Sequence, residues 1–183
     1  MEIDGLGILW WEVKTLEKLS TNNRWYTLVI LSSIPIIMVL GNSMIIPVLP
    51  TIGSKFEVTS FRTSLLITLF SIPAAITIPI AGILADRVGR KKTIFFSLIL
   101  YGSGGLLSGL AAIWGSYSFM LISRIIQGIG AAGTAPITMV LVSDLYQEDE
   151  RSKSLGIIEA ANAMGKVLSP ILGSLLAMIV WYA

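Results

Sequence analysis

The chain has 183 residues, of which 54% are hydrophobic and only 13% are charged, and its formal net charge is +2. A typical soluble domain has about 25% charged residues, so this composition and a mean hydropathy of +0.81 argue against a soluble fold. Cysteine and histidine are both absent. Their absence excludes disulfides, thiolate catalysis and histidine-based metal or proton-relay sites, so any proton exchange needs a carboxylate.

The first 25 residues are expected to form a separate cytoplasmic segment. Glu2 and Asp4 stand where a cleavable signal peptide carries basic residues, and no apolar core follows them. Residues 8–19 (ILWWEVKTLEKL) instead mix Trp, Leu and Val with Glu and Lys at roughly helical spacing. This pattern predicts an amphipathic helix on the inner membrane surface, with a disordered tail as the alternative.

Five long apolar segments follow, and residues 26–183 are interpreted as one transmembrane domain. Each segment is near or above the roughly 20 residues that a helix needs to cross the hydrocarbon core. Their expected bounds are 26–49, 63–84, 93–113, 117–142 and 155–180. Strands are implausible because the segments are apolar throughout instead of alternating, and are about twice as long as a barrel strand. The expected fold class is therefore an all-α integral membrane protein.

The placement of basic residues predicts which side of the membrane each connection faces. Short loops rich in Lys and Arg stay in the cytoplasm. With the N-terminus inside, nine Lys and Arg are cytoplasmic, two (Lys55 and Arg62) are outside, and two (Arg124 and Lys166) lie within the membrane. All the tryptophans fall at segment ends or in surface segments, as an interfacial aromatic belt requires. We therefore predict a multi-pass protein of the cell (plasma) membrane with a cytoplasmic N-terminus.

The loop between the second and third segments carries the most specific pattern in the chain. It reads G-x-L-A-D-R-x-G-R-K from Gly82 to Lys91. This pattern closely resembles the signature loop between helices 2 and 3 of the major facilitator superfamily of transporters. The resemblance implies that the loop and an acid at the inner end of helix 4 together lock one conformational state. The gating residues expected on this basis are Gly82, Asp86, Arg87, Gly89, Arg90, Lys91 and Asp144.

The fourth segment carries a charge inside the membrane. Arg124 lies about 10 Å below the outer boundary at 1.5 Å per residue, and a charge at such a depth costs about 3 kcal/mol. Residues 121–132 resemble the fourth-helix motif of the superfamily, L-x-x-R-x-x-Q-G-x-G-A-A. The resemblance implies that Arg124 and Gln127 serve proton coupling or the electrostatics of a substrate cavity. The alternative is a structural arginine bonded to carbonyl groups of a neighbouring helix.

The fifth segment carries a polar stripe. Glu159, Asn162 and Lys166 lie on one helical face, and Ser169 and Gly173 continue the stripe at spacings of three and four residues. About 10 Å along the axis separates Glu159 from Lys166, so water or a third partner is expected between them. A hydrated substrate cavity is therefore favoured over a dry core. The alternative is that Glu159 extends towards the inner membrane surface.

The fifth segment also resembles the motif of drug and metabolite antiporters in the superfamily, G-x8-G-x3-G-P-x2-G-G. Serine replaces two of its glycines, at positions 169 and 174. The first segment ends in the run PVLP at residues 47–50, similar to the first-helix exit of drug:proton exporters. Many of those exporters carry an acid near the position of Asn42, which leaves Glu159 as the candidate proton carrier by elimination. The helix-packing residues implied by the antiporter motif are Gly156, Gly165, Ser169, Pro170 and Gly173.

Together these resemblances imply a secondary active transporter that exports a small drug-like or metabolite substrate. The chain is similar to the amino-terminal half of such a protein, with five helices, and is expected to be an incomplete portion of it. A proton gradient is the expected energy source, with no cofactor and no metal. The expected partners are the lipid bilayer, a small-molecule substrate and a missing carboxy-terminal half, with no nucleic acid.

Two other functions remain open, and one class is disfavoured. An uptake symporter of a sugar or organic acid is one alternative, and a non-transporting truncated or regulatory membrane protein is the other. A membrane-embedded enzyme is disfavoured because a chain without His and Cys, and with one deep carboxylate, offers no metal set, no nucleophile–base pair and no carboxylate dyad.

Overall fold

The computed structural model describes residues 24–179, and all regular structure within this range is helical. The helices in chain order are α2 (Arg24–Ser43), the 3-10 helix η1 (Ile46–Val48), α3 (Leu49–Lys55), α4 (Ser60–Val88), α5 (Arg90–Ile113), α6 (Tyr117–Ala132), α7 (Ala135–Leu145) and α8 (Glu148–Ile179). Five stretches are long and apolar enough to cross a membrane. These stretches confirm the predicted all-α membrane fold with five spans. The amphipathic helix predicted for residues 8–19 lies outside the described residues.

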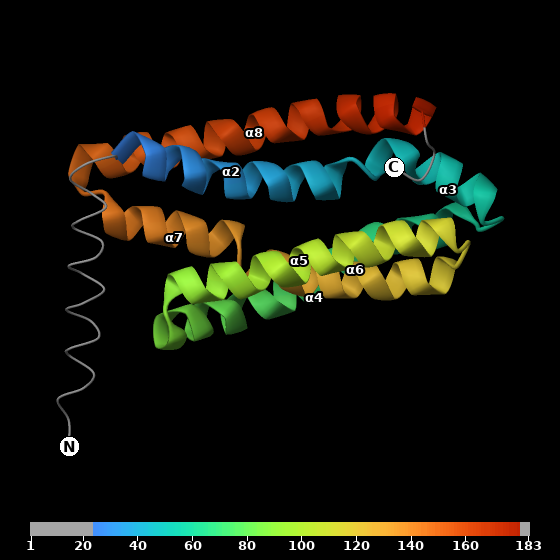
Figure 1. Ribbon diagram of the computed structural model, residues 1–183, viewed down its shortest axis with the longest axis horizontal. Coiled ribbons are helices and arrows are strands. Elements are labelled where there is room, and N and C mark those ends of the chain that lie inside the picture. The colour runs from blue at the N-terminus through green and yellow to red at the C-terminus, as the bar shows by residue number, and fades with distance from the viewer. Residues whose placement is uncertain (1–23, 180–183) are drawn as a thin grey trace, which may run out of the picture.

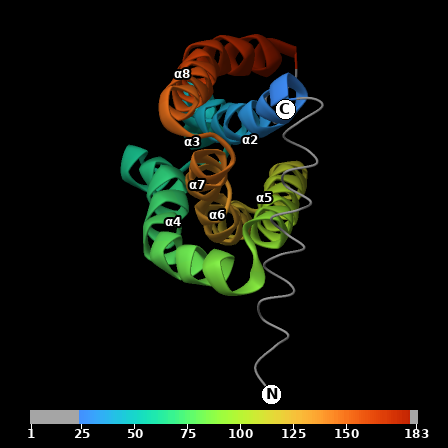
Figure 2. The same ribbon diagram turned by 90° about the vertical axis from the view of Figure 1, so that its left-hand side faces the viewer.

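The helices form two layers (Figures 1 and 2). Helices α2 and α8 pack along each other in one layer, and α3 continues the line of α2. Helix α6 packs against both α4 and α5 in the other layer. Helix α7 contacts α2 and α8 as well as α4 and α5, and Figure 2 shows it between the two layers. Helix α7 therefore joins the two layers on one side, and the contact of α3 with α4 joins them on the other.

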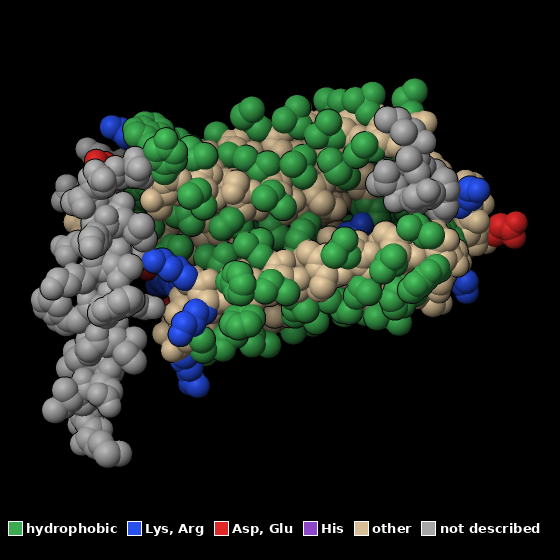
Figure 3. Space-filling model, viewed as in Figure 1, with side chains coloured by type: hydrophobic (Ala, Val, Ile, Leu, Met, Phe, Trp, Pro, Cys, Tyr) green, Lys and Arg blue, Asp and Glu red, His purple; other side chains and the backbone are tan. Residues whose placement is uncertain are grey.

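Charged residues gather at the two ends of the molecule, whereas its long sides are mostly apolar (Figure 3). The end at the left of Figure 1 holds the α4–α5 and α7–α8 turns, and we call it the basic end. Its basic residues are Arg87, Arg90, Lys91, Lys92, Arg151 and Lys153. The opposite end, which holds α3 and the α5–α6 turn, is called the distal end. This distribution is the one expected of a protein whose sides face lipid.

The tight turn at the basic end depends on a glycine. Helix α4 ends and α5 begins on either side of Gly89, whose φ is 102°. Glycine adopts a positive φ without the steric cost that a Cβ would bring. The amide of Gly89 donates to the carbonyl of Ala85, and its own carbonyl accepts from the amide of Thr93. A single residue therefore reverses the chain and places Arg90 directly at the start of α5.

Two of the expected spans are interrupted. The first does not run unbroken to residue 49, because α2 ends at Ser43 and the chain continues through η1 into α3. The expected single helix over residues 117–142 is two helices, α6 and α7, separated at Gly133 and Thr134. The Thr134 hydroxyl donates to the carbonyl of Ala131 at 2.7 Å, and Pro136 lies in the first turn of α7, where its missing amide hydrogen is harmless.

Glycines let α6 approach its two neighbours at backbone distance. A Cβ on Gly128 would collide with the carbonyl oxygen of Phe70 in α4. A Cβ on Gly130 would collide with the backbone of Tyr101 in α5. Close backbone contact of this kind is a main source of association between helices in lipid. The layer of α4, α5 and α6 is therefore a tightly packed unit.

Candidate functional site

An ion-pair cluster at the basic end joins three helices. Arg90, the first residue of α5, forms an ion pair with Asp144 near the end of α7. The Arg90 Nη1 also donates to the carbonyl of Val140 at 3.1 Å, and the Nη2 lies 3.7 Å from the Asp86 carboxylate in α4. We call Asp86, Arg90 and Asp144 the charge cluster. It fastens α7 to the α4–α5 turn.

The three side chains differ in their exposure to solvent. Arg90 is 25% exposed, Asp144 47% and Asp86 72%. Ion pairs between exposed groups contribute up to about 1 kcal/mol, so the pair of Arg90 with Asp144 is the better shielded and the stronger of the two. A link of this size can hold one arrangement of the helices and still be broken by a modest change in free energy.

The structure brings only part of the expected gating set together. Gly89 supplies the turn, and the charge cluster forms around it. Arg87 and Lys91 are exposed and form no ion pair with any described residue. A Cβ placed on Gly82 would meet no atom within 4 Å, so no close contact explains a glycine there.

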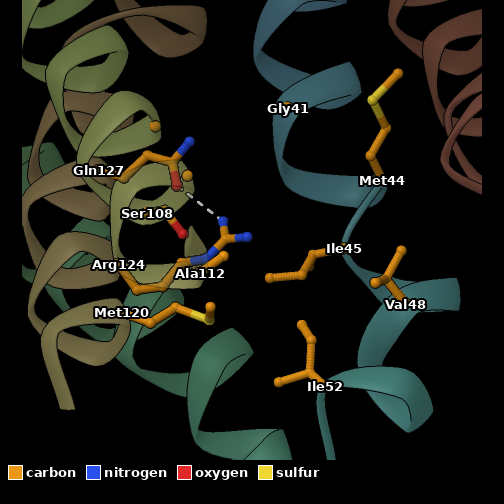
Figure 4. A pocket seen from close by; sticks show the side chains of 12 residues that line it. Gly41, Met44, Ile45, Val48, Ile52, Ser108, Ala112, Met120, Arg124 and Gln127 are labelled. Atoms are coloured by element: carbon orange, nitrogen blue, oxygen red, sulfur yellow. Dashed lines mark hydrogen bonds between the residues drawn. The ribbon is translucent and has the colours of Figure 1, made fainter. Parts of the chain in front are cut away.

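A cavity of about 220 Å³ lies between the two layers. One wall comes from α2, η1 and α3, and the other comes from α5 and α6 (Figure 4). In Figure 3 a blue basic side chain is visible in a hollow between the two layers. The lining residues are Gly41, Met44, Ile45, Val48, Ile52, Gly105, Ser108, Gly109, Ala112, Met120, Arg124 and Gln127.

Arg124 is the charged group of this cavity. Its side chain projects from α6, and the residue is only 4% exposed. The Nη1 donates to the Oε1 of Gln127 at 2.8 Å, and the Nε has no hydrogen-bond partner among the described residues. In the described part of the chain, no acid pairs with Arg124 and no carbonyl of a neighbouring helix accepts from it. The alternative of a carbonyl-bonded structural arginine is therefore not supported.

Tyr101 is a residue near the cavity that sequence reasoning missed. It is 6% exposed, and its hydroxyl donates to the carbonyl of Met38 at 2.8 Å, which ties α5 to α2. A Cβ on Gly41 would lie 2.5 Å from that hydroxyl oxygen, so the glycine leaves room for the tyrosine. The available signal was a tyrosine in the middle of an apolar segment, because a buried hydroxyl needs a partner.

The structure packs only part of the polar stripe of α8 against another helix. Ser169 lies against α2, where its hydroxyl donates to the carbonyl of Leu40 at 2.9 Å. A Cβ on Gly173 would lie 2.6 Å from the carbonyl oxygen of Met44, and a Cβ on Gly165 would lie 3.4 Å from the Val39 side chain. These three residues therefore form the packing face of α8.

The charged residues of the stripe stay exposed beside this packing face. Glu159 and Lys166 are exposed, and Asn162 is half-buried. The Asn162 amide donates to both carboxylate oxygens of Glu159, at 3.2 and 3.3 Å. None of these residues lines the Arg124 cavity, and neither does the half-buried Asn42. The expected cavity set is thus split between two places, with Arg124 and Gln127 in one and the α8 charges in the other.

One expected packing residue makes no close contact within the described chain. Gly156 is exposed, and a Cβ there would meet no atom within 4 Å. Pro170 is half-buried inside α8, next to Ser169. Gly156 lies on the open side of α8, so its expected packing role stays a prediction.

Comparison with known proteins gives consistent relatives. The Major Facilitator Superfamily model matches residues 31–183. The bacillibactin exporter of Bacillus subtilis is 50% identical over 159 residues, which cover 85% of this chain and 40% of that protein. Multidrug resistance protein 2 of Bacillus subtilis is 33% identical over 160 residues, which cover 87% of this chain and 39% of that protein.

Multidrug resistance protein 1 of the same organism is 32% identical over 153 residues, covering 84% of this chain and 39% of that protein. This chain therefore spans about two fifths of the length of these relatives. The relatives are transporters, and the family match covers all five membrane-spanning stretches in whole or in large part. This chain belongs to the Major Facilitator Superfamily of membrane transporters.

Proposed function

We propose that this chain forms the amino-terminal part of a secondary active exporter of small amphipathic molecules, driven by a proton gradient. The observation that carries the proposal is the charge cluster, which fastens the α4–α5 turn to α7 at one end of the bundle. Two relatives are named as a bacillibactin exporter and a multidrug resistance protein, and these names favour export over uptake.

The charge cluster acts as a latch at the basic end. While Arg90 holds Asp144, α7 stays against the α4–α5 turn, and the two layers cannot separate at that end. Releasing Arg90 lets α7 move with α2 and α8, which are its partners in the other layer. Hinged or sliding motion of packed helices is a common way for a protein to open one side of a site and close the other.

Glu159 is the proposed proton carrier. It lies well inside the α8 span and is exposed within the described part of the chain. A carboxylate can take up a proton on one side of the membrane and release it on the other. Asn162 holds the carboxylate by two hydrogen bonds, and Lys166 places a positive charge two turns away on α8.

The proposed orientation places the basic end in the cytoplasm of the cell and the Arg124 cavity towards the outer half of the plasma membrane. The N-terminus is then inside, and residues 1–25 lie at the inner surface. The rule that short basic loops stay in the cytoplasm supports this assignment. A carboxy-terminal half is the proposed partner, because the relatives extend well beyond the matched region.

A chimeric protein tests the proposed function. Residues 1–183 are joined to the part of the bacillibactin exporter that follows its matched region, and the chimera is made in cells without competing efflux pumps. Accumulation of anionic, neutral and cationic amphipathic dyes is then measured with and without a protonophore. We expect at least one dye to accumulate less than in cells making the Arg90→Ala chimera, and the protonophore to remove the difference. Higher accumulation than in cells making the Arg90→Ala chimera would indicate uptake. Equal accumulation of every dye in the two kinds of cell would contradict transport.

A further inference from the structure

The polar groups of the Arg124 cavity are hydrogen-bond donors. A guanidinium carries five N–H groups and no acceptor. Among the residues that the structure describes, the one hydrogen-bond partner of Arg124 is the Oε1 of Gln127, which accepts from Nη1. That bond occupies the amide oxygen of Gln127 and leaves its NH2 group as a further donor. The Ser108 hydroxyl lines the same cavity and can donate as well.

The positive charge of Arg124 has no counter-charge in the described chain. The residue is only 4% exposed, and its Nε is buried without a hydrogen-bond partner. A buried charge is strongly unfavourable unless it is paired and hydrogen-bonded. An oxyanion in the adjoining cavity would supply both the negative charge and the acceptor atoms that this guanidinium can bind.

The rest of the wall is apolar. Ile45 and Ile52 point across the cavity towards the guanidinium, Met44 and Val48 line the same wall, and Met120 lies near the guanidinium on α6 (Figure 4). Apolar walls around a few convergent polar groups are typical of small-molecule sites. Methionine side chains also adapt to ligands of different shape. The volume of about 220 Å³ is enough for a small organic body in addition to an anionic group.

We propose that this cavity binds an amphipathic organic anion. Its carboxylate or related oxyanion accepts hydrogen bonds from Arg124, in the two-point geometry that a guanidinium favours, and from Ser108. Its apolar part lies against Met44, Ile45 and Val48. The identification of this ligand as the transported substrate rests on the proposed export function, whereas the binding itself does not.

Paired probes test the charge requirement. The 183-residue chain is placed in nanodiscs of phosphatidylcholine and titrated by calorimetry with 2-naphthoate and with 2-naphthamide, which has the same shape but no charge. We expect 2-naphthoate to bind at least tenfold more tightly than the amide. Arg124→Gln should abolish this preference, and Arg124→Lys should keep part of it. Equal affinity for the two probes, or an unchanged preference in Arg124→Gln, would overturn the proposal.

A second pair of variants tests the place of binding without changing any charge. Gly109 lines the cavity, and a Cβ there meets no atom within 4 Å, so Gly109→Leu fills space with little strain. Gly102, on the same helix, is equally unobstructed but lies outside the cavity, so Gly102→Leu is the matched control. We expect Gly109→Leu to lose 2-naphthoate binding, and Gly102→Leu and the surface variant Arg62→Gln to keep it. Binding that survives Gly109→Leu would overturn the proposed place.

A lipid arm distinguishes a free anion from a lipid headgroup, which would offer the same chemistry. The 2-naphthoate titration is repeated in nanodiscs that contain phosphatidylglycerol. Unchanged affinity supports a free organic anion. If phosphatidylglycerol weakens 2-naphthoate binding, and this effect depends on Arg124, the cavity would be assigned to a lipid phosphate. That result would overturn its assignment to a substrate. Failure of the chimera to export would leave all these binding results intact, so the two proposals can fail separately.

Discussion

Arg90 links more elements than any other residue of the charge cluster. It begins α5, pairs with Asp144 of α7 and Asp86 of α4, and donates to the carbonyl of Val140. Because one guanidinium serves all three partners, a shift of α7 changes every one of these contacts. The cluster is therefore sensitive to the position of α7 and suits a latch that must open and close.

The two acids of the charge cluster should not be equivalent. Asp144 pairs with Arg90 at the better shielded site, whereas Asp86 is 72% exposed and lies 3.7 Å away. We expect Asp144→Asn to reduce the transport rate of the chimera by about fivefold, the equivalent of roughly 1 kcal/mol, and Asp86→Asn to have a smaller effect. Dye efflux measures both variants. A double variant that exchanges the charges, Arg90→Asp with Asp144→Arg, should recover part of the transport rate. Equal losses of rate in Asp144→Asn and Asp86→Asn would contradict this ranking.

The carboxylate of Glu159 should be needed for coupling and not for binding. Glu159→Gln keeps a side chain of the same size that can still bond to Asn162, but it cannot exchange a proton. We expect efflux by this variant of the chimera to lose its dependence on external pH, while binding of the dye is unchanged. Glu57→Gln, at the distal end, is the control and should keep the dependence. A normal pH response in Glu159→Gln would move the coupling acid to another part of the protein.

Sequence reasoning located the important residues of the site but not all their contacts. A charge in an apolar segment identified Arg124, and its motif named Gln127, which does bond to it. Tyr101 was missed because its partner is a backbone carbonyl on a helix 63 residues away, which no local pattern reveals. The spacing placed the α8 stripe on one side of the helix, but it could not show that Ser169 and Gly173 pack on α2 while Glu159 and Lys166 stay exposed.

At the scale of the helices, α8 offers a matched pair of glycines. A Cβ on Gly173 would lie 2.6 Å from the backbone of Met44, whereas a Cβ on Gly156 would meet nothing within 4 Å. We expect Gly173→Ala to destabilise the chain by about 1–3 kcal/mol through overpacking. Gly156→Ala should stabilise it by up to about 1 kcal/mol, because alanine favours the helix. Both changes in the free energy of unfolding are measured by SDS titration in a mild detergent, with circular dichroism as the signal. Equal changes for the two variants would contradict the packing of α8 on α2.

The five spans were predictable because hydropathy and length determine which segments can cross a bilayer. The interruptions within these spans were not predictable from hydropathy and length. Residues 117–142 stay apolar through the break, so nothing in their hydropathy marks the end of α6. The break depends on tertiary contacts: the side chain of Ser97 leaves no room for a Cβ at Gly133, and the Thr134 hydroxyl bonds to Ala131 and approaches the sulfur of Met38.

At the scale of the whole molecule, the two layers meet differently along their length. Near the basic end an apolar core runs through both layers by way of α7, and includes Leu31 of α2, Ala85 of α4, Leu141 and Val142 of α7 and Ile158 of α8. Towards the distal end a second apolar core joins the layers, with Val48 of η1 and Ile52 of α3 against Leu66 of α4, and the Arg124 cavity lies beside it. The conformation is therefore closed at the basic end. In the proposed orientation this is a state that is shut towards the cytoplasm.

The orientation of the bundle is the claim on which the latch, the proton path and the direction of transport all depend. The chain has no cysteine, so single cysteines can report it without background. Ser54 and Ser60 are exposed at the distal end, and Ser152 is exposed at the basic end. Ser116 is unsuitable because its hydroxyl caps α6 by accepting from the amide of Phe119.

The most direct measurement is labelling of Ser54→Cys, Ser60→Cys and Ser152→Cys in intact cells with a membrane-impermeant maleimide. We expect both distal cysteines to react from outside, because the excess of Lys and Arg retains the basic end in the cytoplasm. Ser152→Cys should react only after the cells are permeabilised, which also controls for its accessibility. Labelling of Ser152→Cys in intact cells together with protection of both distal cysteines would contradict the orientation and the account built on it.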